Sequence, residues 1–188
     1  RAQHAYQHYQ SYLSAKQDRY ALTFTDLVYV KNFKGGSAII DEPLQTCQSK
    51  LGFYEKALRA CADDLSFGPT LATIPDKEYP RIRANIVAFA ALPKGDQSDI
   101  SGFGSSFASA LLHFFFPLVV PILDKRALNG SGVQGIQVNR SNNVTNLLGL
   151  YPVLIDSCRS RLQENRELTL RDLDRMLFIE RLNRPPFQ

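Results

Sequence analysis

Residues 99–130 read DISGFGSSFASALLHFFFPLVVPILDKRALNG, and this stretch decides the fold. Gly102 and Gly104 predict a tight turn that leads directly into an apolar helix from about Ser105 to Phe116. The first N–H groups of such a helix have no acceptor within the helix, and the positive end of the helix dipole adds to them. The turn is therefore a candidate seat for an anion.

A short helix is expected after the apolar one. Pro117 and Pro121 bracket an extended connection, because proline cannot donate in a helix interior and biases its predecessor away from it. Asp124 follows, and the next residues predict a short helix that Asn129 and Gly130 end. The Asp124 carboxylate is thus expected at the N-cap, where the helix dipole favours its ionised form.

This order of residues resembles the signature of the helix-hairpin-helix DNA glycosylases: Gly-Phe-Gly, a Ser-x-Ala-Ser-Ala-Leu-Leu helix, and then Pro-Ile-Leu-Asp. A weaker similarity to small bacterial 8-oxoguanine-glycosylase-like proteins extends over most of the chain. The resemblance implies a hairpin that binds a DNA phosphate through backbone N–H groups, with Asp124 as the catalytic carboxylate. Bifunctional members carry a lysine nucleophile where this chain has Ser106, so the resemblance implies a monofunctional enzyme that uses water.

The candidate phosphate contacts lie in the hairpin and in the first turn of the short helix. Ser105 and Ser106 carry short hydroxyls that can bind a phosphate without crowding it. Lys125 and Arg126 follow the acid directly; they hold the phosphates beside an extruded nucleotide or simply form a solvated turn. The full set is Gly102, Phe103, Gly104, Ser105, Ser106, Lys125 and Arg126.

The chemistry of base excision needs few groups from the protein. A glycosylase extrudes a base and stabilises the positive charge that develops on the sugar. One ionised carboxylate in a water-poor cleft is the minimum for this, so Asp124 is the candidate catalytic residue; the alternative is a plain N-cap aspartate. Ser106 has no visible histidine or lysine partner and is not expected to be a nucleophile. His113, on an apolar helix, is interpreted as a satisfied core histidine.

The whole chain predicts a mainly α protein, a two-lobed helical bundle with a helix-hairpin-helix motif. Apolar residues recur at helical spacing on both sides of the glycine turn. We expect one compact glycosylase-like domain over residues 1–188, with the hairpin and catalytic segment at 99–130 and C-terminal helices at 144–182. An N-terminal helix with an aromatic face that includes Tyr6 and Tyr9 is expected either to dock on the body or, alternatively, to stack on bases.

Segment 22–40 is rich in β-branched and aromatic residues and contains a Gly-Gly pair at 35–36. This composition predicts at most a short strand or hairpin, or an irregular loop. Lys31, Asn32 and Lys34 are candidate loop contacts to a phosphate, because glycine has no Cβ to hold the backbone away. The alternative is a solvated hairpin tip.

Charge and cysteine content suit a cytoplasmic, nucleoid-associated protein that is monomeric and binds double-stranded DNA. The net charge is +4 and the pI near 9.0, a modest excess that fits a polyanionic partner. Three widely spaced cysteines predict reduced thiols and are too few for a four-cysteine iron-sulfur loop. We expect no metal site, although the resemblance allows a monovalent cation held by hairpin carbonyls.

No membrane span or signal peptide is expected. Because the sequence begins with Arg1 rather than Met, some preceding residues are expected to be missing.

Two functions other than that of a glycosylase remain open. One is a catalytically inactive helix-hairpin-helix DNA-binding module, and the other is a helical protein-interaction domain in which the glycine turn is only a connector. Binding to DNA that weakens steeply with salt separates the first from the second.

Overall fold

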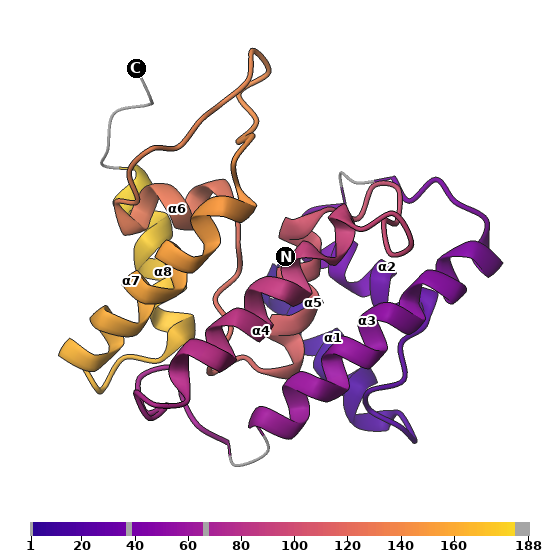
Figure 1. Cartoon of the computed structure of the whole chain (residues 1–188), viewed down its shortest axis with the longest axis horizontal. Coiled ribbons are helices and arrows are strands. Elements are labelled where there is room, and N and C mark those ends of the chain that lie inside the picture. Colours follow the sequence, from indigo (N-terminus) through magenta and orange to yellow (C-terminus); the bar gives the residue numbers. More distant parts are fainter. Residues whose placement is uncertain (1, 37–38, 66–67, 183–188) are drawn as a thin grey trace.

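A computed structural model describes residues 2–36, 39–65 and 68–182, and over these residues the protein is mainly α-helical, which confirms the predicted fold class. Figure 1 shows α1–α3 on one side of the molecule, α6–α8 on the other, and α4 and α5 between them. The helices are α1 (Ala2–Ala15), α2 (Phe24–Phe33), α3 (Leu44–Leu65), α4 (Tyr79–Ala91), α5 (Ser105–Phe115), α6 (Lys125–Ser131), α7 (Tyr151–Glu164) and α8 (Leu170–Leu182), with two 3₁₀ turns, η1 (Leu92–Lys94) and η2 (Leu148–Leu150).

Helix α5 is buried because its sequence has no polar face. Every residue from 108 to 115 is buried, including Ser109 and His113. Aromatic rings pack around Phe114, whose ring centre lies 4.5 Å from that of Tyr9 and 5.0 Å from that of Phe33. Such a cluster buries a large apolar area and fixes α1 and α2 against α5.

The N-terminal helix is docked on the body of the protein. Tyr9 is 0% exposed, and its hydroxyl donates a hydrogen bond of 2.9 Å to the buried Asp26 carboxylate. A tyrosine in this position cannot stack on a base. The docked interpretation of α1 is therefore confirmed, and the alternative of a stacking arm that uses Tyr9 is wrong.

The expectation of a strand, hairpin or irregular loop near residues 22–40 is wrong for most of that segment, because α2 occupies 24–33. Thr23 precedes the helix, and its N–H donates to the Asp26 carboxylate at 2.7 Å. Leu27 and Val30, one turn apart, are buried. The N-terminal hydrogen bond and this burial outweigh the strand preference of the β-branched and aromatic residues.

The other expected helices are present, but the C-terminal helices, expected from residue 144, begin only at Tyr151 with α7, after the 3₁₀ turn η2. Helix α8 begins with a capping box, in which Thr169 and Asp172 hydrogen-bond to each other's backbone N–H groups. The short helix α6 continues to Ser131 and ends at Gly132, which is left-handed with φ 76°, so the predicted end at Gly130 is wrong. A Cβ on Gly130 would overlap the Leu177 backbone, which shows how closely α6 and α8 pack.

No helix within the described ranges is both long enough and apolar enough to cross a membrane. Pairing between extended segments is limited, in the same ranges, to an isolated antiparallel bridge between Val138 and Val144 in the connection from α6 to η2.

Candidate functional site

The glycine turn between η1 and α5 is partly covered by the protein's own chain. Gly102 has φ +80°, and a Cβ there would overlap the carbonyl oxygen of Ile39. The neighbouring Ser101 N–H donates to the Glu42 carboxylate at 2.9 Å. Phe103 is buried, and its N–H donates to Ile100 O at 2.8 Å. The Phe103 N–H is therefore used within the chain, and the Ile39 carbonyl lies against one side of the exposed Gly102.

The first turn of α5 keeps its donors available. The N–H groups of Gly104, Ser105 and Ser106 have no acceptor within the described part of the chain. Ser105 is 7% exposed, and its hydroxyl is buried without a hydrogen-bond partner there. Nothing lies near the position of a Cβ on Gly104. The anion seat predicted for the whole hairpin is thus confined to residues 104–106.

Hydrogen bonds along α5 set the position of Asp124 relative to this turn. His113, in the last turn of α5, has Nδ1 2.7 Å from Val120 O, and Leu123 N–H donates to Ser109 Oγ at 2.9 Å, one turn earlier. The connection from Val120 to Leu123 therefore runs back along α5 toward its N-terminus. Asp124, the next residue, lies at the same end of α5 as the unpartnered N–H groups.

Asp124 caps α6 as the sequence predicted. One carboxylate oxygen, Oδ1, accepts the Ala127 N–H at 2.8 Å, and the other, Oδ2, lies 3.2 Å from Lys34 Nζ. The side chain is 30% exposed. Both carboxylate oxygens are thus held in place while part of the group remains accessible, which is what charge stabilisation near a reacting sugar needs.

Helix α8 brings a second carboxyl group near Asp124. Partial burial and then the negative charge of Asp124 raise the pKa of Asp174 above its ordinary value. Asp174 and Ala127 line the same narrow hollow, whose wall also includes His113. His113 Nε2 is buried without a partner in the described residues, so the expected core histidine is only half satisfied.

The hollow beside Asp124 has a volume of about 10 Å³, which is room for roughly one water molecule. A larger hollow of about 600 Å³ is lined by Leu118, Thr73 and the connection between α7 and α8. Leu118 follows the C-terminal end of α5, so this larger hollow lies away from Asp124. Neither of these two hollows is a base-sized pocket with Asp124 in its lining.

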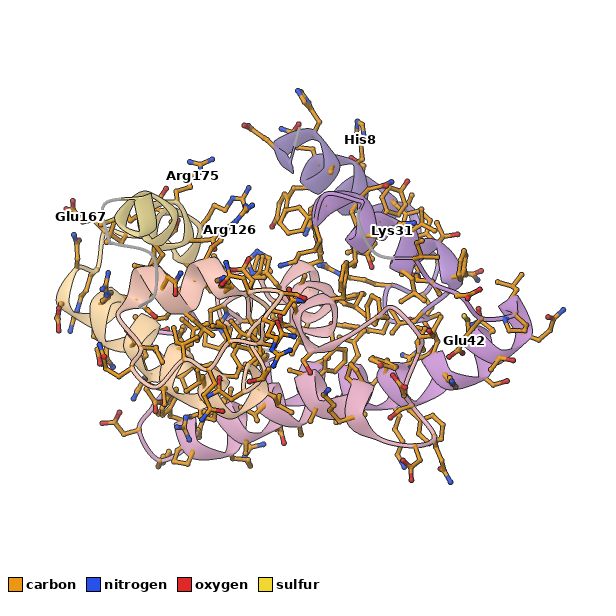
Figure 2. All side chains as sticks on the ribbon, turned by 90° about the horizontal axis from the view of Figure 1, so that it is seen from above. His8, Lys31, Glu42, Arg126, Glu167 and Arg175 are labelled. Atoms are coloured by element: carbon orange, nitrogen blue, oxygen red, sulfur yellow. The ribbon has the colours of Figure 1, made fainter. Side chains whose placement is uncertain are left out.

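One further contact near the site joins the N-terminal and C-terminal helices, and a second joins α6 to the connection that follows it. The Arg171 guanidinium lies over the Tyr6 ring at 5.1 Å, and Lys125 Nζ donates to Asn142 O at 2.8 Å. Figure 2 shows Arg126 and Arg175 projecting from α6 and α8 along one edge of the molecule, with Lys31 and His8 projecting from α2 and α1 further along the same edge.

The structure therefore divides the predicted site residues into four groups. Asp124, Lys34 and residues 104–106 lie at one end of α5, whereas Gly102 and Phe103 make intramolecular contacts. Lys31 and Asn32 belong to the last turn of α2 rather than to a loop. Lys125 and Arg126 form the exposed start of α6, next to Asp124.

Sequence reasoning missed Asp174 and Arg171, because only the packing of α8 brings them toward Asp124. Sequence reasoning also missed the distribution of acidic residues around Asp124. Asp124 is the one acidic residue between Asp99 and Asp156. A long segment without other acids suits a surface that faces a polyanion.

Among the described residues, no group of three or more histidine, cysteine or acidic side chains is arranged to hold a metal ion. Comparisons with protein-family models, with curated protein sequences and with solved structures find no match to this chain. A function must therefore be inferred from the residues and their geometry.

Proposed function

We propose that this protein binds double-stranded DNA and acts as a monofunctional glycosylase that hydrolyses the N-glycosidic bond of a damaged or modified base. Asp124 is the catalytic acid of this proposal. Its carboxylate stabilises the positive charge that develops on the sugar and orients the attacking water. The N–H groups of residues 104–106 bind a phosphate of the same strand.

The observation that carries this proposal is the position of Asp124 at the N-terminal end of α5. A helix N-terminus with unpartnered N–H groups attracts a phosphate, so DNA held there passes close to the carboxylate. The buried Ser105 hydroxyl, which has no partner in the described residues, offers one more donor at this end. Lys34 supports the role of Asp124 by fixing one of its oxygens.

One observation favours a second candidate, a DNA-binding module without activity. The hollow beside Asp124 has room for about one water molecule, whereas an extruded base must enter a pocket of its own size. A base could enter this hollow only if α8, which carries Asp174 and Leu177, moved relative to α6 when DNA binds. A protein in which this movement does not occur would bind DNA and leave its bases in place.

An excision assay with duplexes that carry a panel of damaged or modified bases tests the proposal. We expect the wild-type protein to release one of these bases and Asp124→Asn to release it at least about a hundredfold more slowly. Glu167→Gln is the matched control, because this exposed acid projects from a distant edge of the molecule (Figure 2).

The other outcomes identify the rival functions. Tight binding to abasic-site duplex without release of any base, unchanged in Asp124→Asn, would indicate the inactive module. If duplex DNA is not bound even at low salt, the protein-interaction domain is favoured instead.

A further inference from the structure

The connection between α6 and η2 forms an arm, defined here as residues 134–146, that extends away from the helices it joins (Figure 1). Val138 and Val144 pair across it, and residues 139–143 form its tip. All five tip residues are exposed. The tip therefore adds nothing to the core, and its sequence is free to serve a partner.

The arm is ordered by its own hydrogen bonds. The Asn139 side-chain oxygen accepts the N–H groups of Ser141 and Asn143, both at 3.0 Å. The Asn146 side chain accepts the Gln137 N–H at 3.0 Å, nearer the base of the arm. A tip that is already ordered loses little conformational freedom when a ligand binds.

Lys125 attaches this tip to the candidate site. Its Nζ donates to Asn142 O at 2.8 Å and to Asn142 Oδ1 at 2.6 Å. Lys125 directly follows Asp124 and begins α6. The tip is therefore anchored to the side chain of the residue that directly follows Asp124, to which the proposed function assigns catalysis.

Arg140 lies in the centre of the tip and has no hydrogen bond or ion pair with the described part of the chain. We propose that Arg140 reads a base edge, preferentially guanine, in a groove of DNA beside the nucleotide that Asp124 faces. This inference rests on the DNA binding of the proposed function but does not require base excision. It assigns the arm a role in choosing the sequence around the target.

Two features favour base reading over simple phosphate contact. The planar fork of an arginine matches two acceptors on the guanine edge, and the ordered tip fixes the backbone from which this side chain extends. The neighbouring Ser141 and Asn143 side chains offer acceptors as well as donors. Base edges present donors as well as acceptors, whereas phosphates offer only acceptors, so the acceptors of these side chains are useful at a base edge and not at a phosphate.

Binding of the full chain to a library of duplexes with randomised sequence tests this role. We expect the wild-type protein to prefer guanine at one fixed position by about tenfold or more. Arg140→Lys and Arg140→Ala should both lose the preference, because lysine keeps the charge but not the fork. Lys56→Ala, which removes an exposed charge from α3, should retain it.

Three results would overturn the proposed role of Arg140. It is wrong if the wild-type protein binds without sequence preference, or if the Arg140 variants keep the wild-type preference, which would show that other residues read the base. If the protein binds no duplex DNA, both the reading role of Arg140 and the proposed function are wrong. Loss of the preference in both Arg140 variants, in a protein that excises no base, would instead support the reading role and remove only the glycosylase activity.

Discussion

Lys34 and Asp124 are separated by 90 positions in the sequence, yet Lys34 Nζ lies 3.2 Å from Asp124 Oδ2. Lys34 ends α2 and Asp124 begins α6, so this ion pair joins the N-terminal helices to the C-terminal ones. The Tyr6–Arg171 contact joins α1 to α8 in the same way. The candidate catalytic residue thus lies where the two halves of the molecule meet.

The capping and catalytic roles of Asp124 can be separated by the choice of substitution. Asparagine is as good an N-cap as aspartate, so Asp124→Asn should keep the hydrogen bond to Ala127 N–H and lose at most about 1 kcal/mol of stability with the partly exposed ion pair. Asp124→Ala also loses the cap and should cost about 0.5–2 kcal/mol more. Denaturant unfolding of the two variants measures the difference. Equal stabilities would show that the cap observed at Ala127 contributes nothing.

The two glycines of the turn should respond differently to alanine. Gly102→Ala introduces a side chain at positive φ and against the Ile39 carbonyl, so we expect a loss of at least about 1–3 kcal/mol of stability. Gly104→Ala meets open space at an ordinary φ of −79° and should change stability by less than about 1 kcal/mol. Denaturant unfolding of both variants tests the contrast.

DNA binding by the same variants then tests the anion seat. A methyl group on Gly104 stands where the phosphate would approach, so Gly104→Ala should weaken duplex binding although the protein remains folded. Full binding by this variant would place the phosphate elsewhere.

Local patterns in the sequence predicted the helices whose signals are local. The apolar spacing of α3 and the capping box of α8 lie within the helices they specify, and Asp124 was predicted as an N-cap from the residues that follow it. Helix α2 was missed because its signal is partly tertiary: Asp26 accepts hydrogen bonds from Lys16 and Tyr9, which belong to other parts of the chain. Lys34 was expected near a phosphate, and no local pattern relates it to Asp124.

The environment of Lys34 predicts that the protein forms no covalent intermediate with DNA. A nucleophilic lysine needs its nitrogen lone pair free to attack a sugar carbon, whereas Lys34 Nζ is held in an ion pair with the Asp124 carboxylate. Incubation with abasic-site duplex and sodium borohydride should therefore trap no protein–DNA adduct. An adduct that disappears in Lys34→Met but persists in Lys31→Met would show instead that Lys34 acts as a nucleophile.

His113 predicts how stability depends on pH. Burial lowers the pKa of its imidazole to about 4, from an ordinary value of 6.5. Between pH 6.5 and 4 the unfolded chain therefore binds a proton that the folded protein does not, and the free energy of unfolding falls as pH decreases. A difference of this size corresponds to about 3 kcal/mol, present in full above pH 6.5 and lost toward pH 4.

His113→Asn isolates this contribution from the other groups that titrate in the same range. An asparagine amide can donate to Val120 O as the Nδ1–H does, but it does not titrate. Denaturant unfolding at a series of pH values should show wild-type stability falling more steeply than that of the variant between pH 6.5 and 4, because the carboxyl groups common to both proteins cancel in the difference. Parallel curves would mean that the folded protein protonates His113 as readily as the unfolded chain does, and hence that the imidazole is not buried as described.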